Sequence, residues 1–129
     1  MNAEIPPTIT ALLHAGLLVS DLQTARNFYE AVLGLTPLHD RPELPYPGQW
    51  YTLNDRQQLH LMQLSNPDAG SVRPEHGGRD RHIALAVNHL DALIFRLENN
   101  GVHYTLSKSG RPALFCRDPD QNTLEFVEI

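Results

Sequence analysis

The chain has 129 residues, a formal net charge of -5 and a single cysteine. This length suits one domain of ordinary size, which buries a core without disulfide support. The negative charge argues against nucleic acid or an anionic membrane as a partner, and one cysteine fits a reducing compartment. No apolar run approaches the roughly 20 residues that cross a bilayer, and no targeting segment is recognisable, so we expect a cytoplasmic protein.

The first half of the chain predicts one helix and four strands. A strand is expected over 9–19 and a helix over 21–33, where apolar residues recur at helical spacing and Gly34 provides a stop. Ser20 and Gln23 have the spacing of a capping box at the start of this helix. Three shorter apolar runs predict strands around a proline-rich loop at 39–48, and they cover 35–38, 50–53 and 57–64.

The second half predicts the same order of elements. A polar stretch at 66–80, rich in glycine and proline, is expected to connect the halves. A strand over 82–87 precedes a helix that Asn88 caps together with Asp91 and that Gly101 ends. Three further strands are expected over 102–106, 113–116 and 122–129.

An internal repeat accounts for this order. The segments HAGLLV at 14–19 and HIALAV at 82–87 both open with histidine and end with valine, 68 residues apart. The segments LHL at 59–61 and LEF at 124–126 each place a metal-competent side chain between two large apolar ones. Such self-similarity predicts two βαβββ modules, about 9–65 and 81–129, which share a core because each would be marginal alone.

Equivalent positions of the repeat carry side chains that bind transition metals. Pseudo-twofold symmetry would bring four of these side chains towards one point between the modules. The residues that share a strand face with the two opening histidines are small, which would leave a cavity beside the ligands. Imidazoles with a carboxylate suit zinc, nickel, iron, cobalt or manganese better than calcium or magnesium. The predicted ligands of one divalent metal are His14, His60, His82 and Glu125.

Each of these residues also has a structural interpretation. The two opening histidines could be core residues of a protein that has lost its metal, and His60 could lie on a half-exposed strand. Glu125 could pair with a basic residue such as Arg111 or Arg117. Cys116 is expected to be a buried strand residue. The remaining histidines fall in loops or at element ends and are expected to be solvated: His39, His76, His89 and His103.

Three segments together carry a resemblance to a known family. They are LLHAGLLVSDLQTARNFYEAVLGL, RHIALAV and RDPDQNTLEFVEI. Over about residues 9–129 the chain resembles the vicinal oxygen chelate superfamily, which includes glyoxalase I, extradiol dioxygenases, fosfomycin-resistance transferases and bleomycin-resistance proteins. The last two segments, with TLSKSGRP between them, are most similar to glyoxalase-I-like proteins. The resemblance implies an α+β fold in which two βαβββ modules form a cupped mixed sheet.

The ligand positions of the superfamily carry over onto the same four residues, with one departure. Glyoxalase I usually holds Glu or Gln where this chain has His60. Without His60, the set of His14, His82 and Glu125 has the pattern of non-haem iron oxygenases. In either case the metal would polarise adjacent oxygens and stabilise an enolate-like intermediate. An isomerase also needs a base, for which Glu125 is the first candidate and His60 the second.

The resemblance implies a metal-dependent glyoxalase-I-like lyase or isomerase that acts on a small oxygenated substrate or its thiol adduct. The alternatives are an extradiol-type dioxygenase, a thiol transferase and a non-catalytic small-molecule binding protein. Cationic side chains and an aromatic ring are candidates for substrate contact, namely Arg81, Lys108, Arg111 and Trp50. The resemblance also implies a homodimer in which each site takes His14 and His60 from one chain and His82 and Glu125 from the other.

Overall fold

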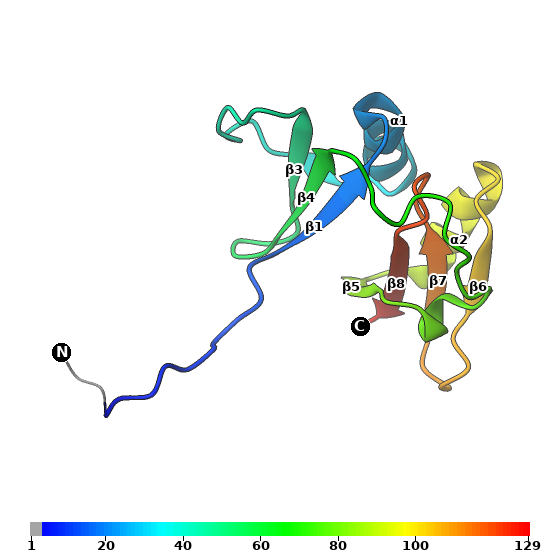
Figure 1. The fold of residues 1–129 in the computed structure, drawn as a ribbon. Coiled ribbons are helices and arrows are strands. Elements are labelled where there is room, and N and C mark those ends of the chain that lie inside the picture. The colour runs from blue at the N-terminus through cyan, green and yellow to red at the C-terminus, as the bar shows by residue number, and fades with distance from the viewer. Residues whose placement is uncertain (1–3) are drawn as a thin grey trace.

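The computed structural model describes residues 4–129, which form two four-stranded sheets that share one core (Figure 1). Strand order is β1-β4-β3-β2 in the first sheet and β5-β8-β7-β6 in the second. This is the predicted α+β fold with its βαβββ order used twice. The strands are β1 His14–Val19, β2 Thr36–Pro37, β3 Gly48–Thr52, β4 Gln58–Gln63, β5 Ile83–Val87, β6 Tyr104–Leu106, β7 Ala113–Arg117 and β8 Thr123–Glu128.

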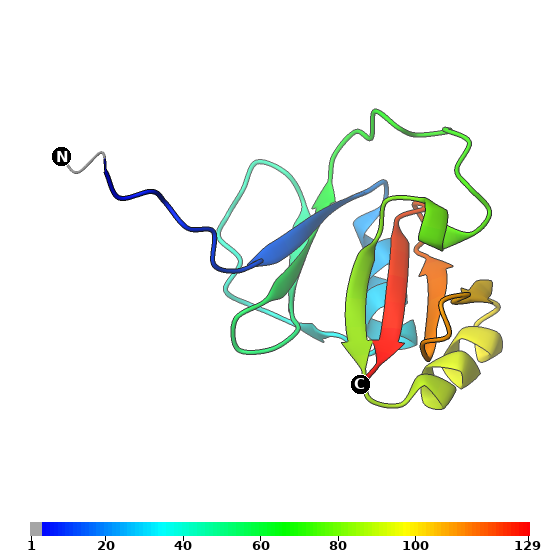
Figure 2. The same cartoon turned by 90° about the horizontal axis from the view of Figure 1, so that it is seen from below.

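A helical segment follows the first strand of each half. In the first half, α1 (Leu22–Arg26) continues into the π-helical η1 (Asn27–Val32), and in the second half α2 spans Leu90–Asn99. A 3-10 turn, η2 (Gly77–Arg79), lies in the connection between the sheets. Figure 2 shows the α1 segment behind the strands and α2 beside the second sheet. Both predicted helices are therefore present, whereas the π-helical turns and η2 had no counterpart in the sequence pattern.

The first strand is shorter than the sequence predicts. It was expected over 9–19, but it begins at His14, and residues 6–13 are exposed and outside any strand. The reason is that β1 pairs in parallel with β4, and the register starts where His14 meets Gln58. The last backbone bond before it is the one that Gln58 N donates to Leu13 O at 3.0 Å. Beyond that point β4 offers no backbone to pair with, so the predicted start was wrong.

The pleat of each sheet separates a core face from an opposite face. Buried apolar residues of both sheets and of the helices meet in the core, among them Tyr29, Tyr51, Leu61, Leu97 and Leu124, each 0% exposed. The opposite face of the first sheet carries His14 and His60, and that of the second carries Glu125. The strands that open the two modules, β1 and β5, each lie at an edge of their sheet. The candidate ligands are thus positioned at or beside these two edges.

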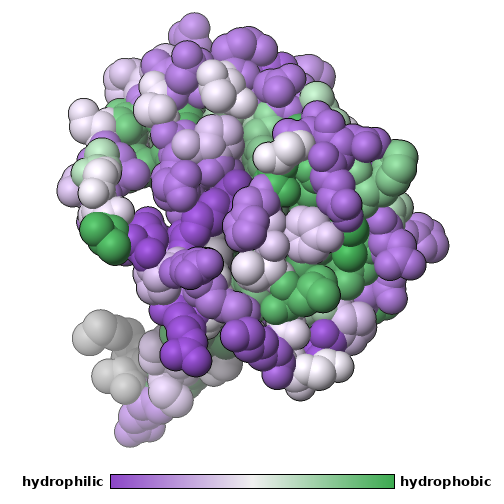
Figure 3. All heavy atoms as spheres, turned by 90° about the vertical axis from the view of Figure 1, so that its right-hand side faces the viewer, coloured by the Kyte–Doolittle hydropathy of each residue, from purple (hydrophilic) through white to green (hydrophobic). Residues whose placement is uncertain are grey.

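The outer side formed by β6 and α2 carries both polar and apolar residues. Figure 3 shows apolar residues lying between polar ones on this side, and the exposed apolar side chains there include Phe95 of α2 and Leu106 of β6. Across residues 4–129, no helix has both the length and the hydropathy to cross a bilayer.

Candidate functional site

The four predicted ligands form two pairs in a single chain. The rings of His14 and His60 stack with their centroids 4.1 Å apart, and His82 Nε2 lies 3.2 Å from Glu125 Oε1. Within residues 4–129, no three or more metal-competent side chains gather at one place. The two edge strands stay apart, and a pocket of about 370 Å³ lined by Gly16 and His82 lies between them. The expected meeting of all four residues at one point is therefore not found within one chain.

His82 has the orientation of a metal ligand. Its Nδ1–H donates to the carbonyl oxygen of Asp80 at 2.8 Å, so in the neutral ring Nε2 carries the lone pair. Nε2 lies 3.2 Å from Glu125 Oε1, an acceptor, so either a proton on Nε2 or a metal cation bound by both atoms would stabilise this contact. Metal–nitrogen and metal–oxygen bonds of about 2.1 Å place neighbouring ligands roughly 3 Å apart. This pair therefore fits a divalent transition metal.

Glu125 is buried at the centre of the second sheet, with only 3% of its surface exposed. Its other oxygen, Oε2, accepts a hydrogen bond from Arg111 Nη2 at 3.0 Å. The structural interpretation of Glu125 as half of an ion pair is thus correct for Arg111. It is wrong for Arg117, which binds Asp80 at 2.8 Å instead. Because Arg111 and His82 contact different oxygens, the ion pair leaves Oε1 free to bind a metal.

His60 lies between two aromatic partners on the first sheet. Its ring is parallel to that of Trp50, with centroids 4.0 Å apart, and it stacks against His14 on the neighbouring strand. Nε2 lies 2.8 Å from Gln58 Oε1, an acceptor, so Nε2 carries the proton and Nδ1 the lone pair. Burial first, and then the charges of His14 and Arg41, lower the pKa of His60 to about 4. His60 is therefore neutral at pH 7, as a metal ligand must be.

An open pocket of about 600 Å³ covers the His14 and His60 pair. A Cβ at Gly16 would lie 3.2 Å from Met62 Cε, so the absence of a side chain at Gly16 keeps this space open. Most of the other lining residues are apolar or aromatic, including Leu13, Leu44, Tyr46, Trp50 and Met62. Of the small residues that predicted a cavity beside the ligands, Gly16 thus lines one, and the wall of this pocket suits the carbon skeleton of a small molecule.

The predicted substrate contacts lie partly on the first sheet and partly in the second half of the chain. Trp50 lies beside His60, whereas the three cationic candidates belong to the second half. Arg81 lines the 370 Å³ pocket and pairs with Asp68 at 2.6 Å, and its side chain is 66% exposed. Lys108 and Arg111 lie on the turn between β6 and β7, where Lys108 is exposed.

Two residues near the site were not indicated by the sequence pattern. Asp80 supplies the carbonyl that orients His82. His76, which was expected to be solvated, is half-buried: its Nδ1 accepts the N–H of Gly78 at 3.0 Å, and its ring lies 5.2 Å from that of Phe115. The adjacent glycines, Gly77 and Gly78, were the available signal of a close backbone approach. Cys116 is buried on its strand, as expected.

Comparison with known proteins identifies the family of this chain. The chain matches the model of the Glyoxalase/Bleomycin resistance protein/Dioxygenase superfamily over residues 11–126. It is 30% identical to a lactoylglutathione lyase of Haemophilus influenzae, with 91% of each chain covered, and 26% identical to Glyoxylase I 4 of Arabidopsis thaliana, with 96% of this chain and 74% of the relative covered. The structure of TnmS3, an antibiotic binding protein from Streptomyces sp. CB03234, matches with a TM-score of 0.71 at 21% identity over 95% and 98% of the two chains. The last match supports the fold alone. Because the family model spans nearly the whole chain, the protein belongs to the Glyoxalase/Bleomycin resistance protein/Dioxygenase superfamily.

Proposed function

We propose that this protein is a metal-dependent lyase or isomerase of the glyoxalase I kind, acting on a small oxygenated substrate or its thiol adduct. The observation that carries the proposal is the pair of His82 Nε2 and Glu125 Oε1, which face each other at 3.2 Å with the tautomer of His82 fixed by a backbone carbonyl. The name of the Haemophilus influenzae relative, lactoylglutathione lyase, supports the same chemistry, since lactoylglutathione is a thioester of a small hydroxy acid.

We propose further that a homodimer completes each site. In one chain the two ligand pairs lie on different sheets, and the opening strands β1 and β5 are both free edges. If the β1 edge of one subunit meets the β5 edge of another, His14 and His60 join His82 and Glu125. A twofold axis then creates two such sites in each dimer.

The proposed site would combine charge stabilisation with proton transfer. His14, His60, His82 and Glu125 would hold a divalent metal, which would supply positive charge to polarise adjacent substrate oxygens and to stabilise the negative charge that develops when a proton leaves carbon. Glu125 takes this proton and returns it to the neighbouring carbon, and His60 is the second candidate for the base. Arg111 orients the Glu125 carboxylate by donating to its other oxygen at 3.0 Å. The pocket over His60 would hold the carbon part of the substrate, with Trp50 in its wall.

Metal analysis of the purified full chain tests this proposal. After growth with zinc, nickel, iron, cobalt and manganese, we expect about one transition metal ion per chain. His82→Ala should lose the metal, whereas His103→Ala, at an exposed position, should keep it. Glu125→Gln should lower the rate of lactoylglutathione formation by about 100-fold or more.

The alternative functions give different results in the same preparations. A protein without bound transition metal that retains a small molecule would be a binding protein rather than an enzyme. Oxygen uptake with catechols would identify a dioxygenase, and addition of a thiol to the substrate without isomerisation would identify a transferase. Each of these outcomes would contradict the proposed lyase.

A further inference from the structure

Asp80, in the connection between the two sheets, contacts His82 through its backbone carbonyl. Its carbonyl oxygen accepts the Nδ1–H of His82 at 2.8 Å. His82 precedes β5, whose pairing with β8 begins at Ile83, and its side chain is 28% exposed. Strand pairing therefore does not hold the ring of His82. The ring instead contacts Glu125 through Nε2 and the ring of Phe115 edge-on at 5.3 Å, and its shortest contact is the one with the carbonyl of Asp80.

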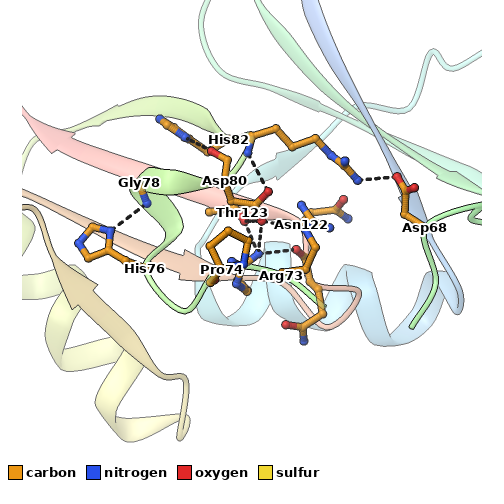
Figure 4. A network of polar contacts seen from close by, with 12 residues as sticks. Asp68, Arg73, Pro74, His76, Gly78, Asp80, His82, Asn122 and Thr123 are labelled. Atoms are coloured by element: carbon orange, nitrogen blue, oxygen red, sulfur yellow. Dashed lines mark hydrogen bonds and ion pairs between the residues drawn. The ribbon is translucent and has the colours of Figure 1, made fainter. Parts of the chain in front are cut away.

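The side chain of Asp80 is held by two guanidinium groups. Its Oδ2 accepts from Arg73 Nε and from Arg117 Nη1, both at 2.8 Å, and from the hydroxyl of Thr123 at 3.3 Å. Its Oδ1 accepts the backbone N–H of Arg81 at 2.8 Å. Figure 4 shows these contacts converging on the carboxylate. Because three donors bind Oδ2 and a fourth binds Oδ1, the side chain of Asp80 is fixed, and this restricts the movement of its backbone.

The same contacts fix the connection to the strands of the second sheet. Arg117 belongs to β7 and Thr123 to β8, the strand that also carries Glu125. Arg117 donates in addition to Pro74 O at 2.6 Å. The turn η2, which directly precedes Asp80, also packs closely on the second sheet. A Cβ on Gly77 of this turn would be only 2.7 Å from Thr123 Cγ2. The position of Asp80 is therefore tied to the strand from which the carboxylate of the proposed site projects.

We propose that Asp80 is a positioning residue for the metal site: it fixes the proton of His82 on Nδ1 and directs Nε2 towards Glu125. This inference rests on the proposed function, since it concerns the metal at that site. The proposed role of Asp80 differs from that of an ordinary structural ion pair. The residue whose side chain the two arginines hold is also the residue whose carbonyl accepts a hydrogen bond from His82. Partners of this kind tune metal affinity through the ligands that they orient.

Binding of Co²⁺ alone to the full chain tests the inference. Asp80→Ala should weaken Co²⁺ binding by about 10- to 100-fold and change the visible absorption spectrum of the bound ion, because the ring of His82 is no longer oriented. Asp68→Ala is the matched control. Asp68 belongs to the same connection and pairs with Arg81, the neighbour of His82, but it makes no hydrogen bond or ion pair with His82 itself. The Asp68→Ala variant should change the affinity for Co²⁺ by less than about 3-fold.

A second measurement does not depend on metal. Nitrogen NMR of the metal-free protein in mildly alkaline buffer reports which ring nitrogen of His82 carries the proton. In the unaltered chain we expect the Nδ1–H tautomer, and in Asp80→Ala a mixture of both tautomers. A role limited to stability would lower the melting temperature of Asp80→Ala and leave the tautomer of His82 unchanged.

Arg73→Met provides a milder test, because it removes one guanidinium and leaves the pair of Asp80 with Arg117 intact. We expect Arg73→Met to lower the affinity for Co²⁺ by about 3- to 10-fold. If Asp80→Ala does not fold, Co²⁺ binding and nitrogen NMR of Arg73→Met test the role of Asp80 in its place. Unaltered affinity together with an unaltered tautomer would overturn the inference. If the unaltered chain binds no Co²⁺, the proposed function fails, while the NMR comparison still tests the contact between Asp80 and His82.

Discussion

Tyr29 joins the two halves of the molecule through a buried hydrogen bond. Its hydroxyl donates to Asp118 Oδ2 at 2.7 Å, and both residues are almost completely buried. Burial raises the pKa of the Asp118 carboxyl, and hydrogen bonds from Asn122 and Tyr29 oppose this effect. The carboxylate therefore depends on its few donors, because water does not replace a donor that is lost.

Tyr29→Phe should lower the free energy of unfolding by about 1–3 kcal/mol, since it leaves a buried acceptor with one donor fewer. Tyr104→Phe is the matched control. The hydroxyl of Tyr104 donates to Glu98 at 3.1 Å at an exposed position, so the loss should stay below about 0.5 kcal/mol. Urea unfolding of the two variants measures both values. Equal losses would show that the bond to Asp118 does not hold the halves together.

The local sequence pattern did not predict the correct N-cap residue of either helix. The first cap is Asp21, which accepts from the N–H groups of Gln23 and Thr24, rather than the predicted Ser20. His89 occupies the second cap position in place of the predicted Asn88, without a side-chain bond. In addition, the first N–H group of each helix donates to a side chain on the last strand of the same half. Leu22 N donates to Gln63 Oε1, and Leu90 N donates to Glu128 Oε1. These partners are 41 and 38 residues away, beyond the reach of a local motif.

At the scale of elements, Glu30 connects the helical segment η1 to β3. Its Oε2 accepts from Arg26 Nε at 2.7 Å and from the hydroxyl of Tyr51 at 2.8 Å. The hydrogen bond from Arg26 is the main reason why the pKa of Glu30 lies below its ordinary value of 4.5. A carboxyl with a lowered pKa in the folded state stabilises the fold above its unfolded pKa. This contribution disappears as the pH falls through the folded pKa.

Glu30→Gln should therefore reduce the free energy of unfolding at pH 7 by about 1 kcal/mol and make the loss of stability below pH 4.5 smaller than in the unaltered chain. Urea unfolding at neutral and acidic pH measures both effects. Glu98→Gln, at an exposed position of α2, should leave the acid sensitivity as it is. The same acid sensitivity in Glu30→Gln and in the unaltered chain would contradict this role of Glu30.

Hydrophobic periodicity was sufficient to predict the kind and order of the elements. Every predicted strand and both helices have counterparts, because alternation along a strand and helical spacing directly reflect which face is buried. Periodicity did not indicate η2, whose position depends on packing against Thr123 and Phe115 from a distant part of the chain. It also extended β1 to Ile9, since apolar residues continue where the partner strand does not.

At the scale of the whole molecule, the repeat identified which residues are equivalent but not where they meet. Within one chain His14 stacks on His60 and His82 contacts Glu125, whereas the internal symmetry predicted that all four residues meet at one point. A repeat in sequence is equally consistent with equivalent pairs that join within one chain or across a twofold axis between chains. In the single chain the two pairs lie on separate sheets, and this favours a site that is completed across a twofold axis between two chains.

Mixing two inactive variants distinguishes these possibilities. In a dimer with shared sites, His14→Ala damages one half of its own chain and Glu125→Ala the other half. A mixed dimer then contains one site with both mutations and one site with neither. Random exchange at equal concentrations makes half of the dimers mixed, so about a quarter of the sites should regain metal and activity. Sites formed within single chains would regain neither.

The control is a mixture of His14→Ala with His60→Ala, which alter the same half of the chain. Every shared site in that mixed dimer contains one damaged half, so neither metal nor activity should return. Mass spectrometry of isotopically labelled subunits verifies that exchange has taken place in both mixtures. Recovery with Glu125→Ala but not with His60→Ala requires that the imidazoles of β1 and β4 and the carboxylate of β8 come from different subunits. Absence of recovery in both mixtures, despite complete exchange, would rule out the shared site.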